Sequence, residues 1–150
     1  MRKRALPALD TPREFDTTTA RSINMRAIMS TGNTTTEARV VKALRAAGIT
    51  GWRRHVKTIG GTPDLVFRSE RVVVFIDGCY WHGCPKCGHI PKTNATYWRQ
   101  KITRNTTRDR RNRATLRRAG YSVIRIWEHE LKRRHPEPAW LRRLHRALAH

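Results

Sequence analysis

The sequence predicts one α/β domain with a central mixed β-sheet flanked by helices. Two short apolar segments, residues 64–67 and 72–76, predict neighbouring strands, and the second is a continuous apolar run typical of a sheet centre. Helical apolar patterns lie on both sides of these strands in the chain, and 150 residues allow one domain with a modest core. We therefore expect the order αβββαβα around a single sheet.

The N-terminal part is predicted to contain an arm followed by helices. Residues 1–20 are polar and basic and predict a flexible N-terminal arm, which leaves 21–150 as the folded domain. A short helix is expected over Ser22–Met29. The segment Thr34–Glu37 has the spacing of a capping box and predicts the start of a second helix, which Gly48 ends.

Three strands are expected next. Trp52–Thr58 predicts an edge strand, and the Gly60-Gly61 pair predicts a turn that leads into the strands at Asp64–Phe67 and Val72–Ile76. The segment Asp77–Ala95 that follows has no helical or strand pattern. It is longer than an ordinary connection, which favours a functional role.

The C-terminal part is predicted to contain a long basic helix, a strand and a last helix. The basic helix spans about Thr96–Arg118 and is followed by a strand over Tyr121–Trp127. Pro136 and Pro138 then interrupt the chain before a terminal helix over Ala139–Ala149.

The charge of the chain indicates a polyanionic partner. Lys and Arg together number 32 and Asp and Glu only 11, which gives a net charge of +21. Nucleic acid is the first candidate, because each phosphate neutralised by Lys or Arg releases counterions. A basic protein without catalytic chemistry remains an alternative on composition alone. The sequence has no apolar run of the roughly 18 residues that a membrane span needs, so we expect a cytoplasmic, nucleoid-associated protein without a membrane partner.

Two carboxylates and a histidine are placed for metal-dependent hydrolysis. Asp64 begins one predicted strand and Asp77 ends the next, so they converge if the strands are neighbours and are predicted to bind Mg²⁺. Histidine is the side chain best suited to general-base chemistry at neutral pH, so His82 is the candidate base, and Glu37 could hold a water. Each has a plainer alternative: both aspartates suit turns, Glu37 suits a helix cap, and His82 could bind zinc.

Three closely spaced cysteines predict a zinc site rather than disulfides. Cys79, Cys84 and Cys87 are an odd number, and the last two have the spacing of a zinc knuckle. A fourth ligand must come from elsewhere, with His129 as the long-range candidate and His89 as the local one. A closed site of this kind would be structural and would order the long loop. Free thiols are the alternative.

An ordered series of short motifs carries a family resemblance over roughly residues 21–131. The motifs are Arg21–Ile28, Asn33-Thr34, Glu37, Gly61–Asp64, Phe75–His82, Pro91–Asn94, Tyr97-Trp98, Lys101-Ile102, Asn105, Arg108–Arg110, Ala119–Tyr121 and Trp127-Glu128. In these motifs the chain resembles the very-short-patch-repair (Vsr) endonucleases, a DNA-repair branch of the restriction-endonuclease-like fold.

The resemblance implies a nuclease that recognises a T:G mismatch in double-stranded DNA. Such mismatches arise when 5-methylcytosine deaminates, and the family nicks the strand 5′ of the thymine with Mg²⁺. Other mismatch-repair proteins are further candidate partners, and we expect a bacterial protein that acts as a monomer. A restriction or defence endonuclease of the same fold is the second hypothesis. A zinc-stabilised DNA-binding module without catalysis is the third.

Several residues match functional positions of the family. Asp64 is similar in position to the Mg²⁺-binding acid, His82 to the catalytic histidine and Glu37 to the acid near the scissile phosphate. The positions of the intercalating rings are occupied by Tyr80, Trp81 and Trp98.

Two positions depart from the pattern of some family members. Asp77 stands where some carry histidine, so metal binding here could use a second carboxylate. His129 stands where some carry cysteine, which makes the expected zinc site Cys₃His.

The long basic helix contains one acid, Asp109. It either pairs with neighbouring arginines or faces the sheet and orients His82 or a substrate-binding arginine. The remaining basic residues predict a phosphate-facing surface. Further candidate DNA-binding residues are Asn105, Arg26, Arg99 and Arg104.

Overall fold

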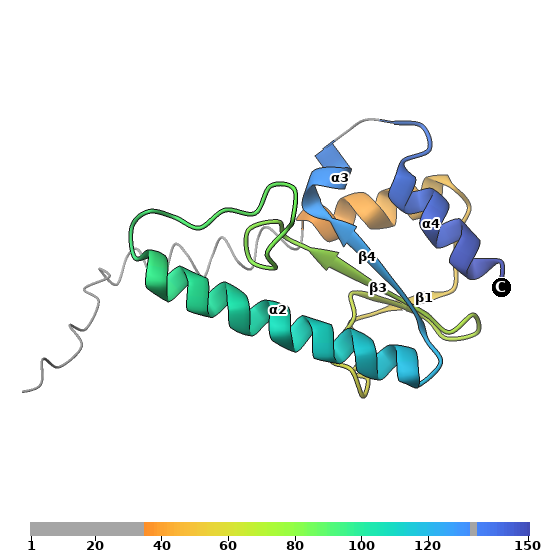
Figure 1. The fold of residues 1–150 in the computed structure, drawn as a ribbon. Helices are drawn as coiled ribbons and strands as arrows, with labels where there is room; N and C mark the ends of the chain where they lie inside the picture. The colour runs from red at the N-terminus through yellow and green to blue at the C-terminus, as the bar shows by residue number, and fades with distance from the viewer. Residues whose placement is uncertain (1–34, 133–134) are drawn as a thin grey trace, which may run out of the picture.

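The computed structural model describes residues 35–132 and 135–150 (Figure 1). Its elements, in chain order, are a helix at residues 35–46, β1 (Trp52–Arg54), β2 (Leu65–Phe67), β3 (Val72–Asp77), α2 (Ala95–Arg118), β4 (Ser122–Trp127), α3 (Glu128–Lys132) and α4 (Ala139–Leu148). The predicted N-terminal arm, the helix at 22–29 and Arg26 lie outside the described residues.

The four strands of the described part form one mixed sheet in the order β1-β2-β3-β4. β1, β2 and β3 pair antiparallel, whereas β3 and β4 pair parallel and are connected through α2. The predicted α/β fold with a central mixed sheet is therefore confirmed. The parallel register places Asp77 beside Trp127, so the ends of β3 and β4 lie together.

Helices cover both faces of the sheet (Figure 1). The helix at residues 35–46 and α4 pack on one face through residues such as Leu44 and Leu144, together with Phe67 from β2. α2 packs on the other face through Leu116, its only buried residue. The rest of α2 extends past the sheet toward the segment 78–94, which has no helix or strand. The exposed half of α2 and this long loop therefore form a lobe beside the strand ends.

Two elements differ from the prediction. β1 ends at Arg54 rather than Thr58, because His55 has a left-handed backbone with a φ of 52° that breaks the extended conformation. The short helix α3 was not predicted. It begins where the Glu130 carboxylate accepts a hydrogen bond from the backbone N–H of Trp127 at 3.0 Å, a local contact without a strong sequence signal.

In the described ranges, we find no helix whose length and apolar character would let it cross a membrane.

Candidate active site and cysteine cluster

Asp64 is fixed at the start of β2 by backbone hydrogen bonds to β3. Its N–H donates to the carbonyl of Val74 at 3.0 Å, and its Oδ2 accepts the N–H of Ile76 at 2.7 Å. Burial raises the pKa of Asp64 to about 6 and outweighs the opposing effect of the Ile76 hydrogen bond, and the charges of Asp77 and Glu37 raise it further. A carboxylate in these surroundings is stabilised by a nearby cation.

Glu37 is a buried carboxylate at the start of the first described helix. It is only 2% exposed, and its two oxygens contact different partners: Oε1 accepts from Arg54 Nε, and Oε2 lies 2.8 Å from His55 Nε2. Glu37, His55 and Asp64 each offer one ligand atom, and these atoms lie within 4.8 Å of one another. The cluster combines oxygen and nitrogen donors that can hold a divalent cation.

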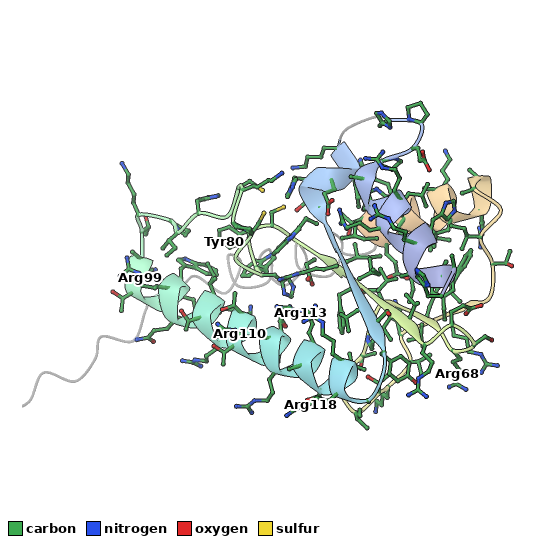
Figure 2. The ribbon with its side chains drawn as sticks, turned by 45° about the vertical axis from the view of Figure 1, so that its right-hand side comes forward. Arg68, Tyr80, Arg99, Arg110, Arg113 and Arg118 are labelled. Carbon is green, nitrogen blue, oxygen red and sulfur yellow. The ribbon has the colours of Figure 1, made fainter. Side chains whose placement is uncertain are left out.

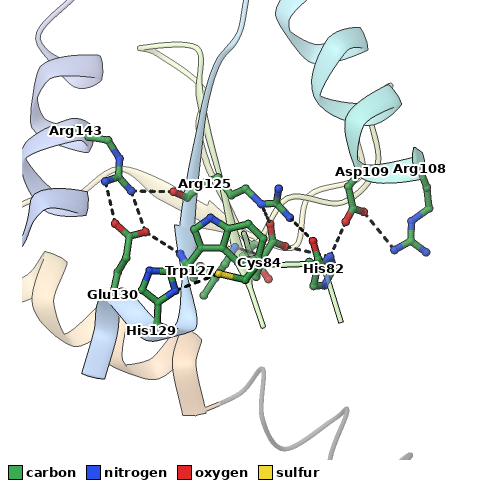
Figure 3. Close-up of polar contacts among 12 residues, drawn as sticks. His82, Cys84, Arg108, Asp109, Arg125, Trp127, His129, Glu130 and Arg143 are labelled. Carbon is green, nitrogen blue, oxygen red and sulfur yellow. Dashed lines mark hydrogen bonds and ion pairs between the residues drawn. The ribbon is translucent and has the colours of Figure 1, made fainter. Parts of the chain in front are cut away.

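His82 forms a dyad with Asp109 across the lobe (Figure 3). Its Nδ1 lies 2.6 Å from Asp109 Oδ2 and 3.6 Å from Asp77 Oδ1. Burial on its own would raise the pKa of Asp109, but the hydrogen bond and charge of His82, with Arg108, outweigh burial and lower this pKa. Of the two predicted geometries for Asp109, the structure has the one in which it faces inward to His82, while its Oδ1 also contacts Arg108 at 3.3 Å.

Asp77 is held by an arginine from the neighbouring strand. Arg125 donates from Nε to Asp77 Oδ2 and from Nη2 to the His82 carbonyl, the latter at 3.4 Å, and its guanidinium lies 3.8 Å from the centre of the Trp127 ring (Figure 3). Arg143 of α4 in turn donates to the Arg125 carbonyl at 3.0 Å. Asp77 thus lies close enough to Asp64 to raise its pKa, with one oxygen bound to a guanidinium.

The three cysteines and His129 meet in one cluster. His129 Nδ1 lies 3.3 Å from Cys79 Sγ, 3.4 Å from Cys84 Sγ and 3.6 Å from Cys87 Sγ, and the last two sulfurs are 3.5 Å apart. Tetrahedral zinc with Zn–S near 2.3 Å and Zn–N near 2.0–2.1 Å requires donor separations of about 3.5–3.8 Å, so the donor set fits zinc. Of the two candidate histidines, His129 joins the cluster.

The thiols of this cluster differ in acidity. Burial and a hydrogen bond with Cys87 raise the pKa of Cys79 to about 12. Burial also acts to raise the pKa of Cys84, but hydrogen bonds from the backbone N–H groups of Cys87 and Lys86, and from neighbouring thiols, lower it overall. Without a metal, Cys84 therefore loses its proton before Cys79.

The aromatic residues predicted to contact DNA gather at the start of α2. Tyr80 lies 4.8 Å from Trp81 and 5.6 Å from Trp98, and the two tryptophan rings are 5.4 Å apart. His89, the other zinc candidate, packs on Tyr80 at 5.4 Å. The ammonium of Lys101 lies 5.3 Å from the Trp81 ring centre and 5.4 Å from that of Trp98. These rings and the cation above them form one surface suited to stacking on bases.

The other predicted DNA-binding residues lie along α2. Asn105 donates to the Trp81 carbonyl at 3.2 Å, which joins the helix to the ring cluster. Arg99 and Arg104 are exposed, and Figure 2 shows Arg99 at the end of α2 near Tyr80.

Sequence reasoning missed two residues of the site. His55 lies in what was predicted to be a regular edge strand, where its side chain would not reach Glu37. Arg125 stands in an otherwise apolar strand, and a charged residue flanked by Ile124 and Ile126 was the signal that could have identified it.

The sequence also matches a known family and known enzymes. The sequence model of the family described as DNA mismatch endonuclease Vsr matches residues 14–87. The type II nicking enzyme V.NmeAIP of Neisseria meningitidis is 44% identical over 77% of this chain and 82% of its own length. The type II nicking enzyme V.NaeI of Lentzea aerocolonigenes is 43% identical over 73% of this chain and 68% of its own length. The DNA mismatch endonuclease Vsr of Escherichia coli is 37% identical over 76% of this chain and 72% of its own length.

The family match includes the strands and the loop that carry Asp64 and His82, and every relative named is a DNA-cutting enzyme. The chain is an endonuclease and belongs to the DNA mismatch endonuclease Vsr family.

Proposed function

We propose that this endonuclease nicks one strand of double-stranded DNA 5′ of the thymine at a T:G mismatch, with Mg²⁺ as the catalytic ion and Zn²⁺ as the structural one. The observation that carries the proposal is the His82–Asp109 dyad. His82 lies 3.6 Å from Asp77, whose charge acts on Asp64, and it follows Tyr80 and Trp81 of the stacked rings on the same loop. General base, metal-binding acid and base-stacking surface are the parts that mismatch nicking needs.

His82 is suited to accept the proton of the attacking water. Because Asp109 is ionised and contacts Nδ1, it favours the tautomer with hydrogen on Nδ1, which leaves the Nε2 lone pair free to act as the base. Asp109 also stabilises the imidazolium that forms after proton transfer. This pair therefore orients the base and supports its charge, as a carboxylate does in other histidine dyads.

Asp64 is the residue best suited to anchor Mg²⁺, which would polarise the scissile phosphate. The sequence-based proposal adds Asp77 as a second ligand. A carboxylate oxygen of Glu37 lies within 4.8 Å of one of Asp64. Glu37 can therefore act near the same scissile phosphate.

The ring cluster supports mismatch recognition by intercalation. A T:G pair is less stable than a matched pair, so wedging Tyr80, Trp81 and Trp98 beside it costs less unstacking energy than at matched pairs. Stacking on these rings is worth about 1–3 kcal/mol per base, which offsets much of that cost.

The test uses duplexes that differ only at one pair, T:G or T:A, each labelled on either strand. With Mg²⁺, we expect a single cut 5′ of the thymine in the T:G duplex alone. Asp64→Ala and His82→Ala should bind the T:G duplex and fail to cut it. Absence of cutting in every mismatched context, with folded zinc-loaded protein, would contradict the proposal.

A second candidate is a nicking or restriction endonuclease that reads a particular matched sequence. It is supported by the relatives V.NaeI and V.NmeAIP, which are named type II nicking enzymes. Supercoiled plasmid without mismatches separates the two candidates: conversion to open circles or linear DNA favours sequence-specific cutting, whereas uncut plasmid together with nicked T:G duplex favours mismatch repair.

A further inference from the structure

Three residues from separate elements converge in one cluster near the strand ends. Glu37 comes from the helix at residues 35–46, His55 follows β1, and Asp64 precedes β2. Their ligand atoms lie within 4.8 Å of one another, and the oxygen of Glu37 lies 2.8 Å from Nε2 of His55.

The backbone at His55 explains how its side chain reaches this cluster. Consecutive residues of a strand point to opposite faces, yet Arg54 and His55 both contact Glu37. His55 has a φ of 52°, which ends the alternation, and its N–H donates to the Asp64 carbonyl at 3.2 Å. A non-glycine residue in this conformation costs about 1–3 kcal/mol and persists where the surroundings require it. Here the result is an imidazole directed at two carboxylates.

The separations are those of ligands around one ion. Donors about 2.1 Å from an octahedral cation lie about 3 Å apart when adjacent and about 4.2 Å apart when opposite. The His55–Glu37 separation of 2.8 Å agrees with the value for adjacent ligands, and the other ligand atoms lie within 4.8 Å. Asp77 is not part of this group of ligand atoms, and its two oxygens contact Arg125 and lie 3.6 Å from His82.

We propose that His55, together with Glu37 and Asp64, directly binds the divalent ion of this nuclease, and that Asp77 does not. The inference rests on the proposed function only in taking the ion to be the catalytic one. An imidazole ligand also sets an ion preference, because nitrogen is a poorer donor to Mg²⁺ than to softer divalent ions. The site should therefore bind Mn²⁺ more tightly than Mg²⁺.

The experiment detects the nitrogen ligand on Mn²⁺ bound to the full-length, zinc-loaded protein without DNA. Electron spin echo envelope modulation reports a coordinated ¹⁴N directly. We expect this modulation in the wild type, its loss in His55→Ala and His55→Gln, and its retention in Asp77→Asn and His82→Ala. Calorimetry should show Mn²⁺ affinity at least about tenfold weaker for His55→Ala, with a smaller loss for His55→Gln, whose amide oxygen remains a donor.

Zinc content and melting temperature establish that each variant is folded before it is compared. Persistence of nitrogen modulation in His55→Ala and His55→Gln would overturn the inference, as would its absence in the wild type or its loss in Asp77→Asn. Failure of the nicking assay with a His55-dependent nitrogen signal would reject the proposed function and leave the ion site. Normal nicking together with a nitrogen signal that does not change in the His55 variants would reject the ion site and leave the proposed function.

Discussion

At the scale of single residues, the acids of the site differ in their partners more than in their positions. Asp109 pairs with His82, and Asp77 pairs with Arg125, so both negative charges are compensated within the protein. Asp64 is instead buried near two further acids, and its pKa is raised to about 6. A carboxylate that is costly to ionise in the free protein is one whose charge an added cation can stabilise.

The cost of ionising Asp64 predicts a difference in stability between the wild type and Asp64→Asn that depends on pH. The pKa of Asp64 rises from 3.8 to about 6 on folding, so its contribution to stability is full below pH 3.8 and is lost as pH rises through about 6. Asp64→Asn removes this loss and keeps an acceptor for the Ile76 N–H. Without divalent ions, we expect the variant to be more stable than the wild type at pH 7.5, by at most about 3 kcal/mol.

Chemical denaturation at pH 7.5 and pH 4 measures this difference. The advantage of Asp64→Asn should shrink toward zero at pH 4, and Mg²⁺ should stabilise only the wild type. A variant that is less stable than the wild type at pH 7.5 in the absence of Mg²⁺ would show that Asp64 ionises without penalty.

The sequence predicted which residues gather in the cysteine cluster better than it predicted the geometry within the clusters. The cysteine spacing predicted the cluster with His129. The roles that the family resemblance gave to Asp64 and His82 stay predictions. His55 could not be predicted, because a single left-handed residue redirects its side chain and this conformation is uncommon even for histidine, so the sequence does not mark it. Asp77 as a metal ligand stays a prediction from the sequence, whereas the ion site inferred from the structure uses His55 instead.

At the scale of elements, Arg125 ties β4 to the end of β3 and to the loop that carries His82. Its guanidinium contacts Asp77, the His82 carbonyl and the Trp127 ring. Arg125 is therefore a positioning residue for His82.

Arg125→Leu should destabilise the protein strongly, because it leaves Asp77 buried without its partner. Removing one member of a buried ion pair costs roughly 3–5 kcal/mol. Asp77→Asn in the same chain should recover much of that loss, since no charge is then left unpaired. Thermal unfolding of the Arg125→Leu variant and of the Arg125→Leu/Asp77→Asn double variant measures both effects. Equal destabilisation of the two proteins would contradict the expected recovery.

Arg125→Lys separates positioning from stability. Lysine keeps a positive charge for Asp77 but lacks the fork that reaches the His82 carbonyl. We expect nearly wild-type melting and duplex affinity, with single-turnover nicking slowed about tenfold or more. Arg68→Lys, on an exposed turn, is the matched control and should change neither quantity.

The loop at residues 78–94 has no regular structure, and its three cysteines gather around His129 from beyond β4. We expect zinc at this cluster to contribute to the order of the loop. Cys84→Ser should lose zinc and melt at least about 10 °C lower, which corresponds to about 3 kcal/mol or more for a chain of this size. Asp64→Ala should keep one zinc per chain. Metal analysis of both proteins decides this, and zinc retained at full occupancy in Cys84→Ser would rule out the expected ligand set.

The sequence predicted the order of the strands and of the longer helices, but not α3 and not the length of every element. β3 and α2 have strong patterns, a continuous apolar run and a long basic helix, and both occur within one residue of the predicted bounds. β1 is only three residues long, because its end depends on the contact of His55 with the next strand. Such a contact is tertiary, and local propensity does not encode it.

At the scale of the whole molecule, the charge of +21 governs how the protein meets DNA. α2 projects from the sheet with exposed arginines along it (Figure 2). The ring cluster includes Trp98 near the start of α2, and His82 contacts Asp109 near its middle. DNA that reaches the rings must therefore also pass along this helix. We infer that part of the affinity comes from phosphate contacts made by α2.

The number of phosphates that α2 neutralises can be measured from the salt dependence of binding. Arg99 and Arg104 lie on exposed positions of α2 near the rings. Arg99→Ala and Arg104→Ala should each make the negative slope of log affinity against log salt shallower, by about 0.9 for every phosphate that the variant no longer neutralises. Both should weaken binding to T:G and T:A duplexes equally, because phosphates carry no sequence information. Arg68→Ala, at the opposite end of the molecule, is exposed as well and should leave the slope unchanged (Figure 2). Fluorescence anisotropy across a salt series measures the slopes, and an equal decrease for Arg68→Ala would mean that DNA binding follows net charge rather than the surface of α2.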